Sequence, residues 1–295
     1  MKYGVVLPIW QLSVAEAETL ATRAEALGLD GVFVPDHILA KPATTQAYGG
    51  HWPDPFSLLA YLAGRTERIA LGASVIVLPY RNALIAAKAA ATVDQASGGR
   101  FIFGVGVGWD EAEFVDLGLP FRERGKLSDD YIRAIKTAWA QDVPEYKGEY
   151  VRFAGATFSP RPVQRPHPPI WVGGSPGGVS NPAVRRCALL GDVWHPLGLG
   201  LGDLEKGYAM LRDLAARNGR REPLGLAPRN ALDLTETPKG SGRPPFQGTV
   251  DEVVSDLRRV RSLGAEWMTF DLPRTGVPAM ARAMERLATE VKPAV

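Results

Sequence analysis

The 295-residue sequence contains a single cysteine, Cys187, so it cannot form an internal disulfide, and a disulfide-stapled secreted fold is excluded. Cys187 lies in a helical pattern, and we expect it to be a small buried residue rather than a nucleophile. Histidine is also scarce, with four residues, and no group of His, Cys, Asp and Glu has the spacing of metal ligands. We therefore predict no metal site.

Long apolar runs and a strong excess of one charge are missing as well. No stretch approaches the roughly 20 apolar residues of a membrane span, and the apolar run at the N-terminus is too short for a signal peptide. The formal net charge is only +2, and Lys and Arg form no run that would follow a nucleic acid backbone. We expect a cytoplasmic protein that binds neither membranes nor nucleic acids.

What the chain does contain is a regular alternation of short apolar runs and longer amphipathic segments. Strands are predicted at 2–7, 31–34, 69–77, 101–105, 169–172, 192–194, within 224–234 and at 267–272. Helices are predicted at 13–27, 54–65, 82–96, 124–140, 182–190, 204–218, 250–263 and 277–291. Eight such units predict an α/β fold, a single (β/α)₈ TIM barrel over residues 1–295, with a doubly wound open sheet as the alternative.

Local signals mark an insertion and two helix starts. Alternating residues around Lys147 predict a β-hairpin within 142–168, an insertion after the fourth helix. Ser13 and Glu16 have the spacing of a capping box. Asn181 followed by Pro182 predicts an N-cap and a first helical residue.

In a barrel of this kind the active site lies at the carboxyl ends of the strands. There, Asp36 and His37 follow the second strand, and an acid beside an imidazole can move a proton. Small residues before Ser74 and Val75 would let a flat ring approach the third strand. Glycines after the fourth strand, among them Gly106, remove side chains that would obstruct a ligand.

A glycine-rich loop at 173–178 leads directly into a predicted helix. Free N–H groups and the helix dipole converge at such a point, so we expect it to bind a phosphate or phosphodiester. Aromatic residues that suit a planar ligand lie near several strand ends: Trp10, Trp52, Tyr80, Trp109 and Trp194. Arg274 follows the last strand and could bind an anionic substrate.

The order and spacing of several segments resemble the bacterial luciferase-like monooxygenase superfamily, and specifically its branch that depends on the deazaflavin coenzyme F420. The matching segments are Asp36-His37, Gly72 to Val75, Gly98 to Phe101, Gly104 to Trp109 with Glu113-Phe114, Pro168 to Gly174, and Gly191 to Trp194. The resemblance implies a tricyclic ring at the barrel mouth, supported by a bulge after the third strand that often holds a non-prolyl cis peptide. Ser74-Val75 would be that pair.

The resemblance also implies site residues. His37 is the expected acid/base, with Glu113 as the alternative. The expected cofactor contacts are Asp36, Ser74, Val75, Gly106, Gly108, Gly173, Gly174, Ser175 and Trp194. Since relatives often pair, we expect a homodimer acting on a small organic substrate.

The cofactor itself has two candidates. The Asp36-His37 pair is typical of F420 users, which transfer hydride, whereas FMN users more often carry a Glu-His-His-like segment and oxygenate their substrates. A non-catalytic flavin-binding protein is a further alternative. A barrel hydrolase with Asp36, Glu113 or Asp271 as paired carboxylates is another.

Overall fold

The protein forms one curled parallel sheet, seen in a computed structural model that describes residues 1–174 and 179–295. The strand order is β10-β9-β8-β5-β3-β2-β1-β14-β11, and every neighbouring pair is parallel. The strands are β1 (Lys2–Val6), β2 (Gly31–Val34), β3 (Ala70–Ala73), β5 (Phe101–Gly106), β8 (Ile170–Gly173), β9 (Val193–His195), β10 (Gly225–Leu226), β11 (Arg229–Ala231) and β14 (Trp267–Asp271). The predicted α/β fold with a parallel sheet is confirmed.

The two edges of the sheet are parts of one segment of chain. β10 and β11 stand at opposite ends of the strand order but are separated only by Ala227 and Pro228. The Ala227 N–H donates to Trp194 O on one side (2.9 Å), and Pro228 O accepts from the Thr269 N–H on the other (2.9 Å). The sheet therefore curls until both edges meet at residues 225–231.

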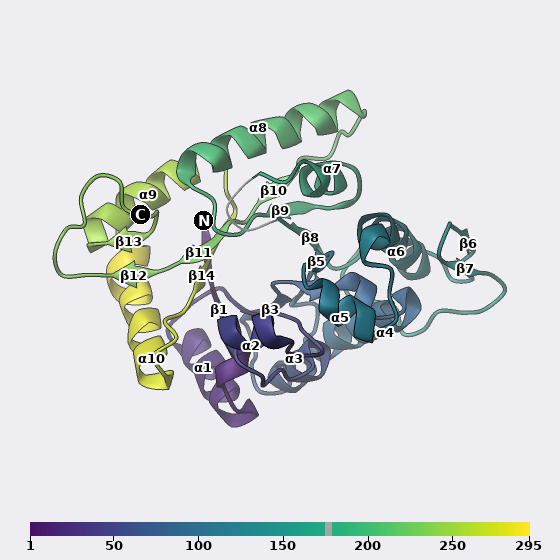
Figure 1. Ribbon diagram of the computed structural model, residues 1–295, viewed down its shortest axis with the longest axis horizontal. Coiled ribbons are helices and arrows are strands. Elements are labelled where there is room, and N and C mark those ends of the chain that lie inside the picture. Colours follow the sequence, from purple (N-terminus) through teal and green to yellow (C-terminus); the bar gives the residue numbers. More distant parts are fainter. Residues whose placement is uncertain (175–178) are drawn as a thin grey trace.

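Helices pack around the outside of the sheet (Figure 1). They are α1 (Val14–Ala26), α3 (Pro55–Ala63), α4 (Ala83–Ala96), α6 (Arg124–Ala140), α7 (Asn181–Leu190), α8 (Leu201–Arg217), α9 (Val250–Ser262) and α10 (Val277–Arg286). The predicted capping box of Ser13 and Glu16 is present at the start of α1. At α7 the N-cap is Ser180 rather than the predicted Asn181, which is already helical. No helix of the described part of the chain is long and apolar enough to cross a membrane.

The loops at the carboxyl ends of the strands contain elements that the sequence pattern did not predict. The strand predicted at 69–77 is interrupted at Ser74 and Val75, whose peptide bond is cis, and resumes as β4 (Ile76–Val77) beside β5. The cis bond implied by the resemblance is therefore present. Two short helices, α2 (Pro42–Tyr48) and α5 (Glu111–Asp116), lie in the loops after β2 and β5. Each is two turns or less, too short to show a helical period.

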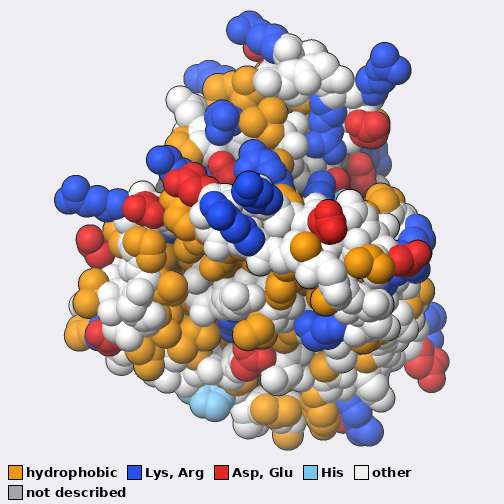
Figure 2. Space-filling model, turned by 90° about the vertical axis from the view of Figure 1, so that its right-hand side faces the viewer, with side chains coloured by type: hydrophobic (Ala, Val, Ile, Leu, Met, Phe, Trp, Pro, Cys, Tyr) orange, Lys and Arg blue, Asp and Glu red, His pale blue; other side chains and the backbone are white. Residues whose placement is uncertain are grey.

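Two small two-stranded sheets lie outside the main sheet. The predicted hairpin forms between β6 (Tyr146–Lys147) and β7 (Arg152–Phe153), after α6, and it extends from the side of the protein in Figure 1. In the view of that side, Lys and Arg side chains gather near the centre with Asp and Glu beside them (Figure 2). The second small sheet pairs β12 (Asp233–Leu234) with β13 (Gln247–Gly248).

Aromatic side chains fill the interior of the curled sheet toward the amino ends of its strands. Phe33 stacks on Trp171 with ring centroids 5.1 Å apart, and Trp267 contacts both rings. Gly72 leaves room for this packing, because a Cβ there would lie 2.5 Å from Phe33. These aromatic side chains fill the curled sheet toward the amino ends of its strands. The carboxyl ends of the strands are left free to line a cavity.

Candidate active site

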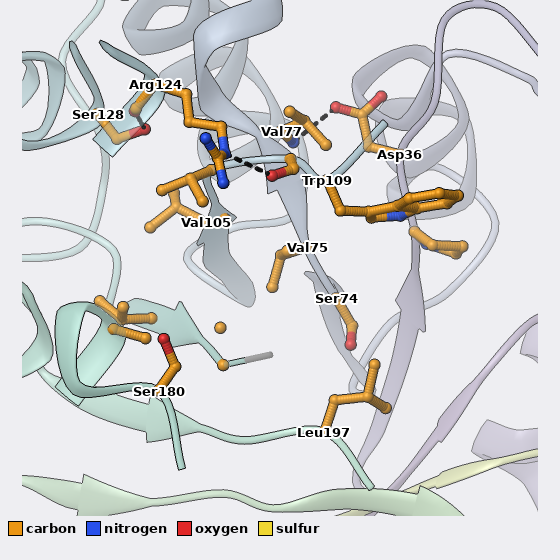
Figure 3. Close-up of a pocket in the computed structure, with 18 of the residues that line it drawn as sticks. Asp36, Ser74, Val75, Val77, Val105, Trp109, Arg124, Ser128, Ser180 and Leu197 are labelled. Carbon is orange, nitrogen blue, oxygen red and sulfur yellow. Dashed lines mark hydrogen bonds between the residues drawn. The ribbon is translucent and has the colours of Figure 1, made fainter. Parts of the chain in front are cut away.

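A cavity of about 450 Å³ opens at the carboxyl ends of the strands. This volume lies within the roughly 300–1,000 Å³ typical of small-molecule sites. Its described lining includes Asp36 and His37 after β2, Ser74, Val75 and Val77 around the β3–β4 interruption, Gly106 to Trp109 at the end of β5 and after it, and Gly173-Gly174 at the end of β8. Figure 3 shows Val75 between Arg124, Ser128 and Ser180 on one side and Trp109 on the other.

Two of the glycines at the cavity make room for the side chain of Val75. A Cβ added at Gly106 would lie 2.5 Å from Val75 Cγ2, and one at Gly173 would lie 3.1 Å from Val75 Cγ1. Gly108 has a positive φ of 80°, and a Cβ there would lie 2.7 Å from Val77 Cγ1. Strands β5 and β8 thus form a glycine notch (Gly106 and Gly173) that seats Val75 at the cavity floor.

His37 is oriented by a buried carboxylate. Its Nδ1 lies 2.8 Å from Glu113 Oε2, and its ring lines the cavity while Glu113 does not. The other Glu113 oxygen accepts the N–H groups of Ile38 (2.5 Å) and Leu39 (2.9 Å), and Tyr80 donates its hydroxyl to Oε2 (2.7 Å). A carboxylate is an acceptor only, so the Nδ1 of His37 carries a proton and Nε2 points to the opposite side, toward the cavity.

The electrostatics keep Glu113 ionised. Burial by itself raises the pKa of Glu113, but the hydrogen bonds from His37, Leu39, Tyr80 and Ile38 outweigh it and hold the pKa below its usual range. Burial and the bond to Glu113 together raise the pKa of the Tyr80 hydroxyl, which stays protonated as a donor. Glu113 therefore lies behind His37 as its orienting partner, not in the cavity wall.

Asp36 is held in an ion pair. Its two oxygens accept from both terminal nitrogens of Arg81 at 2.5 and 3.0 Å, and Oδ2 also accepts the Val77 N–H at 2.9 Å. Burial raises the pKa of Asp36, and the Arg81 guanidinium acts against that shift. Because Val77 belongs to β4, the carboxylate ties the end of β2 to the strand that resumes after Val75.

A second buried network supports Ser74. Its hydroxyl lies 2.7 Å from His195 Nε2, and its hydroxyl and carbonyl oxygens accept from Arg229 at 3.0 and 2.5 Å. Arg229 is paired with Asp271 at 2.6 Å, and His195 Nδ1 lies 2.5 Å from the carbonyl of Ala227. Burial, the largest effect, lowers the pKa of His195 to about 4. The imidazole is therefore neutral and donates from Nδ1, so Nε2 accepts the Ser74 hydroxyl proton.

One end of the cavity is basic. Arg122, Arg124 and Arg186 line it together with Ser180 at the start of α7. Arg186 pairs with Asp129, but neither Arg122 nor Arg124 has a carboxylate within ion-pair distance in the part of the chain that the structure describes. Arg124 donates to the carbonyls of Gly108 and Phe121 instead. Unpaired guanidinium groups beside a helix N-terminus fit an anionic ligand.

The opposite end is aromatic. His37 lies 4.7 Å from the ring centroid of Trp52 and 5.7 Å from that of Trp109. Trp10 packs against Tyr48 (5.1 Å) and Trp52 (5.2 Å). All five side chains line the cavity.

The structure brings most of the predicted site residues together. Those that line the cavity are Asp36, His37, Ser74, Val75, Gly106, Gly108, Gly173 and Gly174. Trp194 does not: its side chain points out of the barrel and packs against Gly207 of α8, where a Cβ would lie 2.4 Å from the indole. Its neighbour His195 points inward instead. Ser175 lies outside the described residues.

Sequence reasoning missed Arg81, Arg124, Arg229 and His195 as site residues. Three of them are arginines, and the alternation of apolar and amphipathic segments gave no reason to place them at the cavity. His195 carried a usable signal, since it directly follows a predicted strand and is one of only four histidines. The paired-carboxylate alternative loses its basis, because Asp36, Glu113 and Asp271 are each engaged by Arg or by several donors.

Sequence comparison shows which known proteins this chain resembles. Residues 1–235 match the family described as luciferase-like monooxygenase. An uncharacterized protein of Mycobacterium tuberculosis is 29% identical over 306 residues, covering 99% of both chains. An FMNH₂-dependent dimethylsulfone monooxygenase of Pseudomonas putida is 32% identical over 70% of this chain and 55% of that enzyme. An F420-dependent glucose-6-phosphate dehydrogenase of Amycolatopsis mediterranei is 33% identical over 60% of this chain and 53% of that enzyme.

Solved structures show the same fold. The monooxygenase RslO1 of Streptomyces bottropensis superposes with a TM-score of 0.84 at 22% identity, covering 99% of both chains. The F420-dependent tetrahydromethanopterin reductase of Methanopyrus kandleri gives 0.80 at 19% identity, covering 99% of this chain and 98% of that one. The fold and site define a luciferase-like oxidoreductase. Since the match covers more than half of the chain, the protein belongs to the luciferase-like monooxygenase family.

Proposed function

We propose that the protein is an F420-dependent oxidoreductase that transfers hydride between the deazaflavin and a small organic substrate. The observation that carries the proposal is a cavity with a basic end, a floor at Ser74-Val75, and the Asp36-His37 pair at the other end. A deazaflavin, when bound, supplies hydride chemistry because carbon replaces the reactive nitrogen of a flavin.

The residues present fit such a cofactor. The unpaired guanidinium groups of Arg122 and Arg124 and the N-terminus of α7 would hold its phosphate and other anionic groups. The side chain of Val75, seated in the glycine notch, would support the ring from below. The network of Ser74, His195 and Arg229 would keep that support rigid, since each polar atom of Ser74 has a partner.

His37 is the residue that handles the proton in this proposal. Glu113 fixes the proton on Nδ1, so Nε2 is the atom that gives a proton to the substrate or takes one from it. When Nε2 is protonated, the ionised Glu113 faces the resulting cation. Glu113 is thus a positioning residue, and the aromatic side chains around His37 exclude water from the transfer.

The second candidate is an FMN-dependent monooxygenase. The match to a dimethylsulfone monooxygenase over 70% of the chain supports it, and FMN also carries one phosphate for the basic end. The Asp36-His37 pair favours F420 over FMN, because this pair is typical of the F420 users that the chain resembles.

Titration of the purified apoprotein with F420 and, separately, FMN tests the proposal. We expect a saturable fluorescence change with F420, and we expect the dissociation constant for F420 to be at least tenfold lower than that for FMN. Replacing His37 by Ala should leave that affinity within about twofold and abolish most turnover, because His37 acts on the proton and not on the phosphate. Tighter binding of FMN would favour the monooxygenase, and no binding of either cofactor would refute the proposal.

A further inference from the structure

A second charged cluster lies at the amino ends of the strands, away from the cavity. Its members are Lys136 of α6, His167 before β8, Asp192 before β9 and Arg220 after α8. None of the four lines the active-site cavity, so the proposed function does not use them. Within the described residues, three basic side chains lie around one carboxylate.

The carboxylate of Asp192 gives neither permanent cation a close partner. Its Oδ1 lies 3.9 Å from Lys136 Nζ and 3.7 Å from Arg220 Nη2, and both distances are too long for a hydrogen bond. Its Oδ2 accepts the Ile170 N–H at 2.8 Å. Since Lys136 and Arg220 approach the same oxygen, their positive charges lie close together.

The guanidinium of Arg220 is held in place with one nitrogen left over. Its Nη1 donates to the carbonyl of Gly191 at 2.7 Å. Its Nη2 makes no hydrogen bond to the residues that the structure describes, and the same is true of Lys136 Nζ. Two cationic nitrogens without hydrogen bonds therefore lie on the same side of the protein, beside Asp192.

This environment disfavours the charged form of Lys136, whose side chain is 29% exposed. Burial, the largest effect, lowers the pKa of Lys136 below its ordinary 10.5, and the charge of Arg220 lowers it further. Asp192 and the buried thiol of Cys187 act in the opposite direction without cancelling the shift. His167 adds no charge at neutral pH, because burial lowers its pKa below 6.5.

An amine in such a place is a better nucleophile than an ordinary surface lysine, because a larger fraction of it is unprotonated at neutral pH. Part of the Lys136 side chain is exposed, so a small reagent can reach it. The nearby guanidinium of Arg220 is a group that binds phosphate oxygens well. A reagent that joins an electrophilic carbon to a phosphate matches both features.

We propose that Lys136 is an acylation site for small acyl phosphates, with Arg220 binding the phosphate of the reagent. While Lys136 is protonated, the cluster has one positive charge in excess, which attracts an anion. Acylation converts Lys136 into a neutral amide and leaves Arg220 and Asp192 as a pair of opposite charges. A protonated Schiff base with an aldehyde would instead keep the charge on nitrogen.

The reaction is a group transfer that balances without a further reagent. The lone pair of neutral Lys136 Nζ attacks the acyl carbon, so a C–N bond forms and the C–O bond to the phosphate breaks. The phosphate leaves with that electron pair and takes the proton that the nitrogen loses. The products are an amide and hydrogen phosphate.

Incubation of the purified protein with acetyl phosphate at neutral pH tests the proposal, with the acetylation of each lysine followed by peptide mass spectrometry. Lys126 is the internal control, because it is exposed on the same helix. We expect Lys136 to react at least about fivefold faster than Lys126. With p-nitrophenyl acetate, an uncharged acyl donor, the ratio of the two rates should be at least about twofold smaller, since this reagent has no phosphate for Arg220.

Three variants separate the two contributions. Arg220→Gln should slow acetylation of Lys136 by acetyl phosphate and make the ratios for the two reagents equal, whereas Arg220→Lys keeps the charge and should retain most of the rate. Asp192→Asn should speed the reaction, because the carboxylate that favours the ammonium is lost while the amide oxygen can still accept the Ile170 N–H. Acetylation of Lys126 should not change, and urea unfolding shows whether each variant is folded.

Opposite shifts in Arg220→Gln and Asp192→Asn would support the proposal. Acetylation of Lys136 no faster than that of Lys126 would overturn it, and so would slower acetylation in Asp192→Asn. Equal ratios for the two reagents in the unchanged protein would overturn the assignment of acyl phosphates, because Arg220 would then not recognise the phosphate. This last comparison needs no variant, so it decides the matter even if Arg220→Gln fails to fold. All of these outcomes are independent of F420 binding.

Discussion

The glycine notch under Val75 makes a sharp prediction for Gly106→Ala. The new Cβ would lie 2.5 Å from Val75 Cγ2, whereas carbon atoms in contact are normally about 3.5–4.0 Å apart. Val75 must therefore move by about 1 Å, and the cavity that it lines gives it space to move into. Overpacking of this kind costs about 1–3 kcal/mol of unfolding free energy.

The displaced side chain should also obstruct the ligand. We expect Gly106→Ala to weaken F420 binding at least tenfold, which corresponds to about 1.4 kcal/mol. The measurements are urea unfolding, followed by tryptophan fluorescence, and titration of the folded variant with F420.

A double variant isolates the contact. Val75→Ala removes the methyl group that the new Cβ would meet. The double variant Gly106→Ala/Val75→Ala should therefore lose about 1–2 kcal/mol less unfolding free energy than the sum of the losses in the two single variants. Gly202→Ala is the matched control, because nothing lies within 4 Å of a Cβ at this helical position. It should leave stability unchanged or raise it by less than about 1 kcal/mol.

The reasoning fails if Gly106→Ala behaves like Gly202→Ala in both assays. It also fails if the effects of Gly106→Ala and Val75→Ala simply add, because then the two side chains do not meet.

Three further predictions concern the polar groups of the site. Glu113→Gln places an amide N–H against His37 Nδ1, so ¹⁵N NMR should show the neutral ring switching its proton to Nε2 while F420 affinity stays within about twofold. His195 has its pKa lowered from 6.5 to about 4, so between these pH values the unfolded chain binds a proton that the folded protein does not. As the pH drops from 6.5 to 5, stability should therefore fall by about 1.6 kcal/mol more than in His195→Gln, since the slope approaches about 1.4 kcal/mol per pH unit only below the unfolded pKa. Equal slopes in urea titrations would contradict this. Arg124→Gln should weaken F420 binding about tenfold and reduce its salt dependence, whereas Arg65→Gln, in an exposed ion pair outside the cavity lining, should do neither.

The sequence by itself determined the alternation of strands and helices and the position of Asp36 and His37. Both follow from local physics: apolar periods of two and 3.6 residues mark the elements, and residues that follow parallel strands meet at one edge. The hairpin after α6 and the capping box at Ser13 are similarly local and were predicted.

Only the tertiary structure decided which side chains face the cavity. Trp194 and His195 are consecutive on β9 and point to opposite faces, and the sequence could not tell which face was inside because apolar residues line both. Glu113 reaches His37 across 76 residues of chain, so its place behind the imidazole depended on where α5 packs. Gly106 and Gly173 lie on neighbouring strands, and their shared function of seating Val75 exists only after those strands pair, because close packing joins residues that no sequence period connects.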